Sequence, residues 1–188
     1  MDDASGVLLT GRDGQAFRFD AGTLCLEFLL SGAVPEWEQL HSPQDLADWI
    51  PLTRLGVTGR ITVTETELTS AKRLRAAIQQ LAESGATADL AALNEMASAP
   101  PPAPVIGADR KRGWAYPVTG AQFLSAVARD AIELFSGPRA GRVRMCAGER
   151  CALLFLDTSR PGARRWCSMD RCGNRQKLRT RRDRTNRA

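Results

Sequence analysis

Histidine is almost absent from this chain of 188 residues, which contains only His41. The sequence also has no glycine-rich phosphate loop, no nucleophile motif and no carboxylate–histidine metal set. These absences argue against an enzyme, so we expect no catalytic residue and no bound organic cofactor. Glu27, Glu36 and Glu38 could line a pocket, but the sequence alone does not show that they converge. His41 falls in a predicted loop, where we expect it to face solvent.

Long hydrophobic runs are absent as well, and no apolar stretch reaches the length needed to span a membrane. The first 14 residues are acidic and lack the basic start and apolar stretch of a signal peptide. We therefore expect a cytoplasmic protein without a membrane partner, in which thiols stay reduced. The hydrophobic content of 43% supports a buried core.

Cysteine is scarce in most of the chain, where Cys25 stands alone and is expected to be a small core residue. The other four are Cys146, Cys151, Cys167 and Cys172. They form two C-x4-C pairs separated by fifteen residues, and each pair can hold one side of a tetrahedral Zn²⁺ ion. Because four thiolates leave no open coordination position, we expect one structural zinc ion. An iron–sulfur cluster is the alternative metal centre.

The residues around these cysteines resemble the bacterial CGNR zinc-finger family, named for the tetrapeptide that is here Cys172-Gly173-Asn174-Arg175. The resemblance covers residues 142–182 and includes Phe155, Asp157 and the run from Arg165 to Met169. It implies a treble-clef-like zinc module and a DNA-binding role in transcription regulators linked to stress.

The preceding residues, 1–137, predict a mostly helical domain with a small β-hairpin. This segment resembles the ABATE domain that accompanies CGNR fingers, on the runs 22–28 and 46–49 ahead of Leu55-Gly56. The predicted fold class is α+β. The helical domain is followed, at residues 141–188, by a treble-clef-like finger with a basic C-terminal helix or tail.

Apolar periodicity and turn residues predict the individual elements. The expected helices cover residues 22–32, 43–56 with a break at Pro51, 64–84, 87–96 and 121–135. The expected strands cover residues 16–20, 105–106, 113–117, 143–146 and 151–156. A final helix is expected after Ser168, whose side chain should cap it. Leu178 on this helix and Trp166 before it are expected to pack in the finger.

Charge is distributed unevenly between the two parts of the chain. Residues 1–140 contain 12 Lys and Arg against 17 Asp and Glu, a net of −5, whereas residues 141–188 contain 14 against 4, a net of +10. This asymmetry favours a basic arm that binds a polyanion, and a solvated tail without a partner is the alternative.

Four arginines of the basic arm recur at spacings of four, four and three, and so share one helical stripe: Arg171, Arg175, Arg179 and Arg182. All the candidate nucleic-acid contacts are Arg164, Arg165, Arg171, Asn174, Arg175, Lys177, Arg179, Arg181 and Arg182. We interpret the protein as a DNA-binding transcription regulator. Its N-terminal domain is expected to sense a small-molecule effector or to form a homodimer. The alternative is an RNA-binding or ribosome-associated zinc module.

Overall fold

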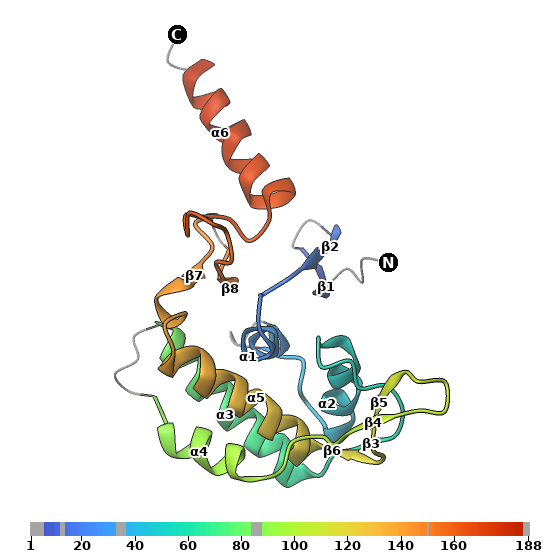
Figure 1. The fold of residues 1–188 in the computed structure, drawn as a ribbon. Coiled ribbons are helices and arrows are strands. Elements are labelled where there is room, and N and C mark those ends of the chain that lie inside the picture. The colour runs from blue at the N-terminus through green and yellow to red at the C-terminus, as the bar shows by residue number, and fades with distance from the viewer. Residues whose placement is uncertain (1–5, 12–13, 33–36, 84–87, 150, 186–188) are drawn as a thin grey trace.

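Helices dominate this computed structural model, which describes residues 6–11, 14–32, 37–83, 88–149 and 151–185 (Figure 1). The helices are α1 (Leu24–Phe28), α2 (Pro43–Trp49), α3 (Glu65–Glu83), α4 (Leu90–Ser98), α5 (Gly120–Ser136) and α6 (Asn174–Thr185). Short 3-10 turns are η1 (Leu29–Ser31), η3 (Ile50–Leu52) and η4 (Ala140–Arg142), and η5 (Met169–Gly173) is a π-helical turn. The elements from α1 to α5 form a bundle that we call the helical body.

The helical body is organised around α5, which contacts α1, α3 and α4. This helix begins with a capping box, because Thr119 accepts from the Gln122 amide and the Gln122 side chain accepts from the Thr119 amide. Its apolar residues then recur every three or four positions, and all four are fully buried: Phe123, Val127, Ala131 and Leu134. The periodicity of the sequence predicted this helix to within one residue at each end.

The strands are short and pair locally, with one exception. They are β1 (Val7–Thr10), β2 (Ala16–Phe19), β3 (Ile61–Thr62), β4 (Pro104–Ile106), β5 (Arg112–Trp114), β6 (Val118–Thr119), β7 (Val143–Met145) and β8 (Leu154–Leu156). Antiparallel pairs join β1 to β2, β4 to β5 and β7 to β8. The exception is the parallel pair of β3 and β6, with Ile61 opposite Val118, which joins the segments before α3 and α5.

The helix predicted from residue 43 is confirmed, and so is its interruption at Pro51. The Ser42 side chain accepts from the Asp45 amide and Pro43 occupies the first turn, so α2 begins as the sequence predicts. Proline lacks an amide hydrogen, and the chain passes into η3 around Pro51. The predicted end of one helix at Gly85 and the predicted start of the next helix at Thr87 lie outside the described residues.

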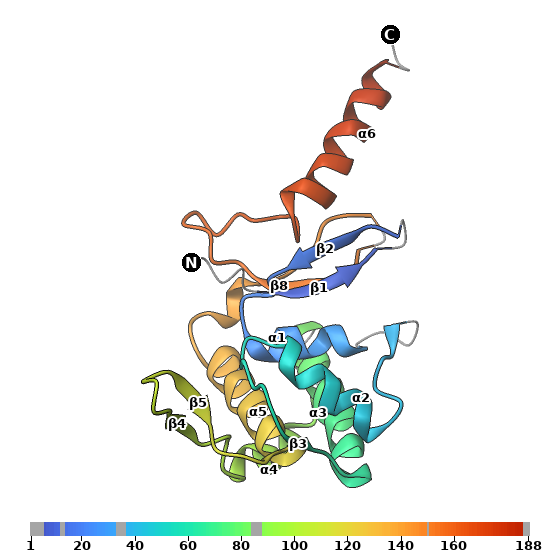
Figure 2. The same ribbon diagram turned by 90° about the vertical axis from the view of Figure 1, so that its right-hand side faces the viewer.

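The finger, which we define as residues 141–185, meets the rest of the chain along β8. The Leu156 amide donates to the Ala21 carbonyl at 2.9 Å, and Leu154, Phe155 and Leu156 are all buried. Figure 2 shows β8 beside the hairpin of β1 and β2, above α1. The division of the chain into domains at residues 137 and 141 stays a prediction, and these contacts show how the two parts meet.

The last helix, α6, extends away from the helical body and from the strands of the finger (Figures 1 and 2). Its extensive contacts are with η5, the turn directly before it. Within the described ranges, no helix is both long and apolar enough to cross a lipid bilayer.

Candidate metal centre and basic helix

The first pair of cysteines lies on the loop that joins β7 to β8. The Cys146 amide donates to the Leu153 carbonyl at 2.9 Å, which continues the antiparallel pairing as far as the first ligand. The chain then turns, and the Cys151 amide donates to the Gly148 carbonyl at 3.0 Å. The ladder thus holds both ends of the loop, so the two thiols face one another as the sequence predicts.

The second pair comes from the chain that leads into α6. Cys167 ends an irregular segment and Cys172 lies within η5. The prediction that the Ser168 side chain caps this helix is wrong, because Ser168 accepts the Gly173 amide through its backbone carbonyl, at 3.1 Å, and makes no capping bond with its hydroxyl. The wider π-helical turn is what brings Cys172 back toward Cys167.

The four sulfur atoms form a compact cluster with the dimensions of a zinc site. All lie within 4.8 Å of one another, with Cys151 Sγ 3.8 Å from Cys167 Sγ and Cys167 Sγ 3.5 Å from Cys172 Sγ. A tetrahedron with Zn–S bonds of about 2.3 Å has sulfur–sulfur edges of about 3.8 Å. The donors and their spacing therefore fit one structural Zn²⁺ ion held by Cys146, Cys151, Cys167 and Cys172.

Backbone amides support the sulfur of the first ligand. Cys146 Sγ accepts from the Cys167 amide at 3.2 Å and from the Gly148 amide at 3.4 Å. Hydrogen bonds from the Cys151 and Cys167 thiols, together with these amides, lower the pKa of Cys146, whereas the bond to Cys146 raises the pKa of Cys151. Thiols this close cannot all ionise without a cation among them, and a bound Zn²⁺ ion supplies that charge.

Glycine is required at position 148 for a steric reason. A Cβ atom there would lie 2.9 Å from Cys172 Sγ and 3.3 Å from Cys146 Sγ. Gly148 therefore allows the loop of the first pair to approach a sulfur of the second pair.

Asp157 and Arg164 hold the segment between the two cysteine pairs, roles that the sequence did not assign. The fully buried Asp157 carboxylate accepts from the Ser159 amide at 2.9 Å, the Ser159 hydroxyl at 2.6 Å and the Arg164 amide at 2.9 Å. The hydroxyl bond is the main reason that the pKa of Asp157 is lowered. The Arg164 guanidinium lies 4.2 Å from the Phe155 ring centroid and donates to the carbonyls of Trp166 and Cys167.

Most of the side chains predicted to contact nucleic acid are exposed. The exposed members are Arg165, Asn174, Arg175, Lys177, Arg179, Arg181 and Arg182. Arg164 and Arg171 are half-buried, and Arg171 stacks on Phe17 of β2 at 4.0 Å from the ring centroid. Contact of any of these side chains with nucleic acid stays a prediction. The expectation that Leu178 packs in the finger is wrong, because this residue is 57% exposed.

The two described carboxylates that the sequence proposed for a pocket are each held by a different arginine of the helical body. The buried Glu27 accepts from the Arg54 amide at 2.8 Å and from Arg54 Nη2 at 2.9 Å. Glu38 accepts from Arg75, which also donates to the Ser31 carbonyl at 2.9 Å. Glu36 lies outside the described residues. These contacts give Glu27 and Glu38 structural partners.

The remaining two candidates have the surroundings that the sequence predicted. His41 is exposed, with ring Nε2 3.1 Å from the Glu38 carbonyl oxygen. Cys25 is fully buried, and burial together with the neighbouring Asp130 raises the pKa of its thiol. A thiol that stays protonated and inaccessible is a core residue, not a reactive one.

Two family models match successive parts of the chain. A family model named ABATE and described as "Putative stress-induced transcription regulator" matches residues 22–138. The CGNR zinc finger model matches residues 142–185, which include all four clustered cysteines. Among curated proteins, none matches the chain.

Proposed function

The chain belongs to the ABATE family and carries a CGNR zinc finger, and from this premise we propose that it is a transcription regulator that binds DNA through α6. The zinc ion has a structural role in this proposal, because four cysteine ligands leave no coordination position for a substrate. We propose no catalytic activity.

The observation that carries the proposal is the composition and position of α6. Six of its 12 residues are Lys or Arg and one is Asp, and it projects from the metal centre instead of packing on the helical body. Like charges on neighbouring turns repel, so such a helix gains stability from a polyanion that neutralises them. Duplex DNA supplies a regular row of phosphates, and its major groove admits an α-helix.

Titration of the zinc-loaded full chain with duplex DNA at several salt concentrations tests the proposal. If α6 neutralises about five to six phosphates, the logarithm of the binding constant falls against the logarithm of salt with a slope of roughly −5. Replacing Arg181 and Arg182 by Ala should flatten the slope by about 2 if both side chains contact phosphate. The matched control replaces Arg110 and Arg112 of the β4–β5 hairpin, which removes the same charge from the helical body.

Absence of DNA binding, or equal effects of the two double variants, would contradict the proposal. A parallel titration with structured RNA decides the alternative. Binding to RNA alone would replace DNA by RNA as the partner, because arginine-rich helices also suit structured RNA.

Of three finer parts of the proposal, the role under stress rests on the family description, whereas the location and the role of the helical body extend the expectations from the sequence. We propose a cytoplasmic protein with a role under stress, in which the helical body senses a small molecule or joins two chains. Light scattering of the full chain with and without DNA measures its mass, and a dimer would present two α6 helices to two half-sites. A monomer under both conditions would contradict dimerisation and leave ligand sensing as the role of the body.

A further inference from the structure

Trp166 lies between two open grooves of the finger. One groove, of about 440 Å³, is lined by Trp166, Gly173, Gln176, Lys177, Thr180 and Arg181. The other, of about 430 Å³, is formed by the segment from Ala163 to Met169. No acidic side chain is among the described residues that line either groove. The indole ring is half-buried, so it packs on the finger and also borders both spaces.

The absence of a side chain at Gly173 shapes this site. A Cβ atom at Gly173 would lie 2.9 Å from Met169 Sδ and 3.4 Å from Trp166 Cδ1. Glycine therefore lets the indole and the Met169 thioether lie directly against the start of α6. The result is an apolar floor with cationic and hydrogen-bonding side chains of α6 beside it.

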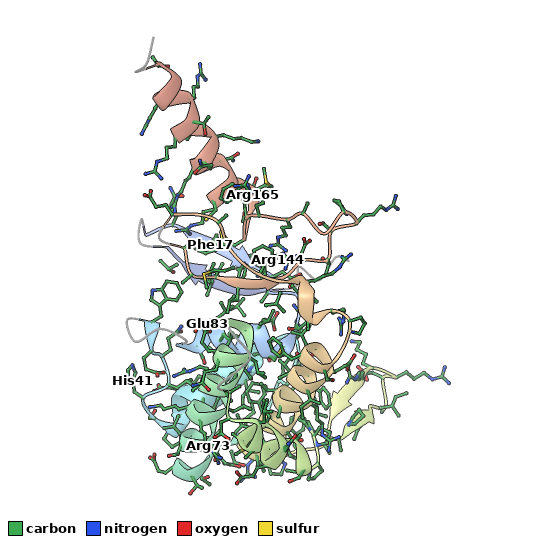
Figure 3. The ribbon with its side chains drawn as sticks, turned by 90° about the vertical axis from the view of Figure 1, so that its left-hand side faces the viewer. Phe17, His41, Arg73, Glu83, Arg144 and Arg165 are labelled. Atoms are coloured by element: carbon green, nitrogen blue, oxygen red, sulfur yellow. The ribbon has the colours of Figure 1, made fainter. Side chains whose placement is uncertain are left out.

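The residues of α6 that line the groove lie on the face opposite the arginine stripe predicted from the sequence. At about 100° per residue, Gln176, Lys177, Thr180 and Arg181 fall on one side of α6, and Arg175, Arg179 and Arg182 fall on the other, while Arg171 precedes the helix in η5. On that other side Arg179 already pairs with Glu149, and Arg171 of η5 stacks on Phe17. Figure 3 shows Arg165 close to the start of α6 and Phe17 on the hairpin below.

The chemistry of this face suits a flat, aromatic ligand attached to an anion. A nucleobase offers a π-face to indole, with which it stacks whatever its sequence, while Lys177, Arg181 and Arg165 can meet the flanking phosphates. The Arg165 guanidinium lies over the Trp166 ring, 5.2 Å from its centroid, so it covers part of one indole face and a base would stack on the surface that remains. Thr180 and Gln176 add groups that can hydrogen-bond a base edge.

We propose that the Trp166 groove binds an unpaired nucleobase, so that the finger prefers DNA in which one base is bulged or unstacked over the same DNA fully paired. This inference rests on the proposed function, because α6 must first bring the finger to DNA. A paired base is stacked on its neighbours within the duplex and cannot enter the groove, which gives the site its selectivity.

The test compares two duplexes of one sequence, one fully paired and one with a single bulged 2-aminopurine, whose fluorescence falls when it stacks on an aromatic ring. The zinc-loaded full chain should bind the bulged duplex about tenfold more tightly, as expected for one base stacked on an aromatic side chain. Trp166→Phe should keep most of this preference and quenching. Trp166→Leu should lose both while it retains affinity for the paired duplex.

A second variant covers the case in which Trp166→Leu disturbs the finger, which zinc content reveals. Thr180 is exposed on α6 and lines the groove. Thr180→Leu fills the groove with an aliphatic side chain, so it should also remove the preference for the bulged duplex. Lys177→Gln should weaken binding of the bulged duplex, whereas Lys72→Gln on α3, a matched change far from α6, should not. Equal binding of the two duplexes, or a preference that survives both Trp166→Leu and Thr180→Leu, overturns the inference alone. Failure of the chain to bind either duplex overturns the proposed function.

Discussion

The helical body and the finger are stabilised by different physical means. The body contains α3, of 19 residues, and α5, of 17, which bury apolar stripes against each other and against α1. The finger has two strands of three residues each and four clustered thiols. A segment this small buries too little surface to fold reliably by itself, so the metal ion must supply much of its stability. Conditions that remove zinc should therefore unfold the finger while the helical body stays folded.

The two regions nevertheless share a joint, so the separation is not complete. Leu156 of the finger donates its amide to Ala21, and Gly22 lies directly against the Leu156 side chain. On the other side of this segment, Arg54 Nη1 donates to the Gly22 carbonyl at 2.8 Å. The segment from Ala21 to Gly22 is thus held by the body and by the finger at once. The predictions below separate the metal, the joint and the body.

Removal of one zinc ligand should have the largest effect. Cys172→Ser should abolish zinc binding and unfold the finger, because apparent binding energies of about 10–16 kcal/mol are typical of structural zinc in such modules. We expect the helical body to stay folded, since its core lies before Gly137. Elemental analysis and thermal melting followed by circular dichroism measure both outcomes. Cys25→Ala is the control and should retain about one zinc ion per chain.

A smaller change at the metal centre tests its packing instead of its ligands. Gly148→Ala places a methyl group 2.9 Å from Cys172 Sγ, so it should weaken zinc binding by roughly ten- to a hundredfold. Gly141→Ala is a matched control, because no atom lies within 4 Å of a Cβ atom there. Competition with a chelator measures both affinities. Equal affinities would mean that the loop moves away without cost.

Local patterns in the sequence predicted the helices and the zinc centre, but not how the regions meet. The register of α5 follows from Phe123 to Leu134, and the cysteine spacing carries the metal site. Strand β1 was missed because its four residues have no clear alternation, and Val7 is buried only once the chain folds back onto Phe19. Strand β3 pairs Ile61 and Thr62 with Val118 and Thr119 of β6, more than fifty residues later in the chain. A local sequence pattern cannot predict a pairing over this separation.

The arginine stripe shows the same limit of local patterns. Helical spacing predicted that Arg171 and Arg179 share one side of the last helix, but Arg171 lies in the π-helical turn η5, before α6 begins. It could not show that Phe17, from the other end of the chain, stacks on Arg171, or that Glu149 pairs with Arg179. Nor could it show the grooves beside Trp166, because these depend on the close approach at Gly173. Contacts with residues far along the chain therefore already engage Arg171 and Arg179.

The joint between the regions should respond to a single methyl group. Gly22 has a φ of +91°, and a Cβ atom there would lie 2.8 Å from Leu156 Cβ. Gly14 has a φ of +73°, and a Cβ atom there meets nothing within 4 Å. Both Ala variants carry the strain of a left-handed backbone, of about 1–2 kcal/mol, and Gly22→Ala should cost roughly 1–2 kcal/mol more through overpacking. Chemical denaturation of both variants measures the difference, and equal costs would show that body and finger are not tightly joined.

Acid should reveal the smallest effect, which belongs to the helical body alone. Partial burial by itself would raise the pKa of Glu38, but hydrogen bonds from Arg75 and the Leu40 amide lower it below its usual value. A carboxyl with a lowered folded-state pKa stabilises the protein above its unfolded pKa, about 4.3, and loses that contribution as the pH falls through the folded value. Glu38→Gln should therefore melt at a lower temperature than the wild type at pH 7, and the gap should narrow below about pH 4. Glu65→Gln on the exposed start of α3 is the control.

Because acid also protonates zinc-bound thiolates, the measurement is made with and without a chelator. If the difference in melting temperature narrows equally with and without the chelator, the effect belongs to the helical body. If it narrows only in the zinc-loaded protein, the effect belongs to the finger.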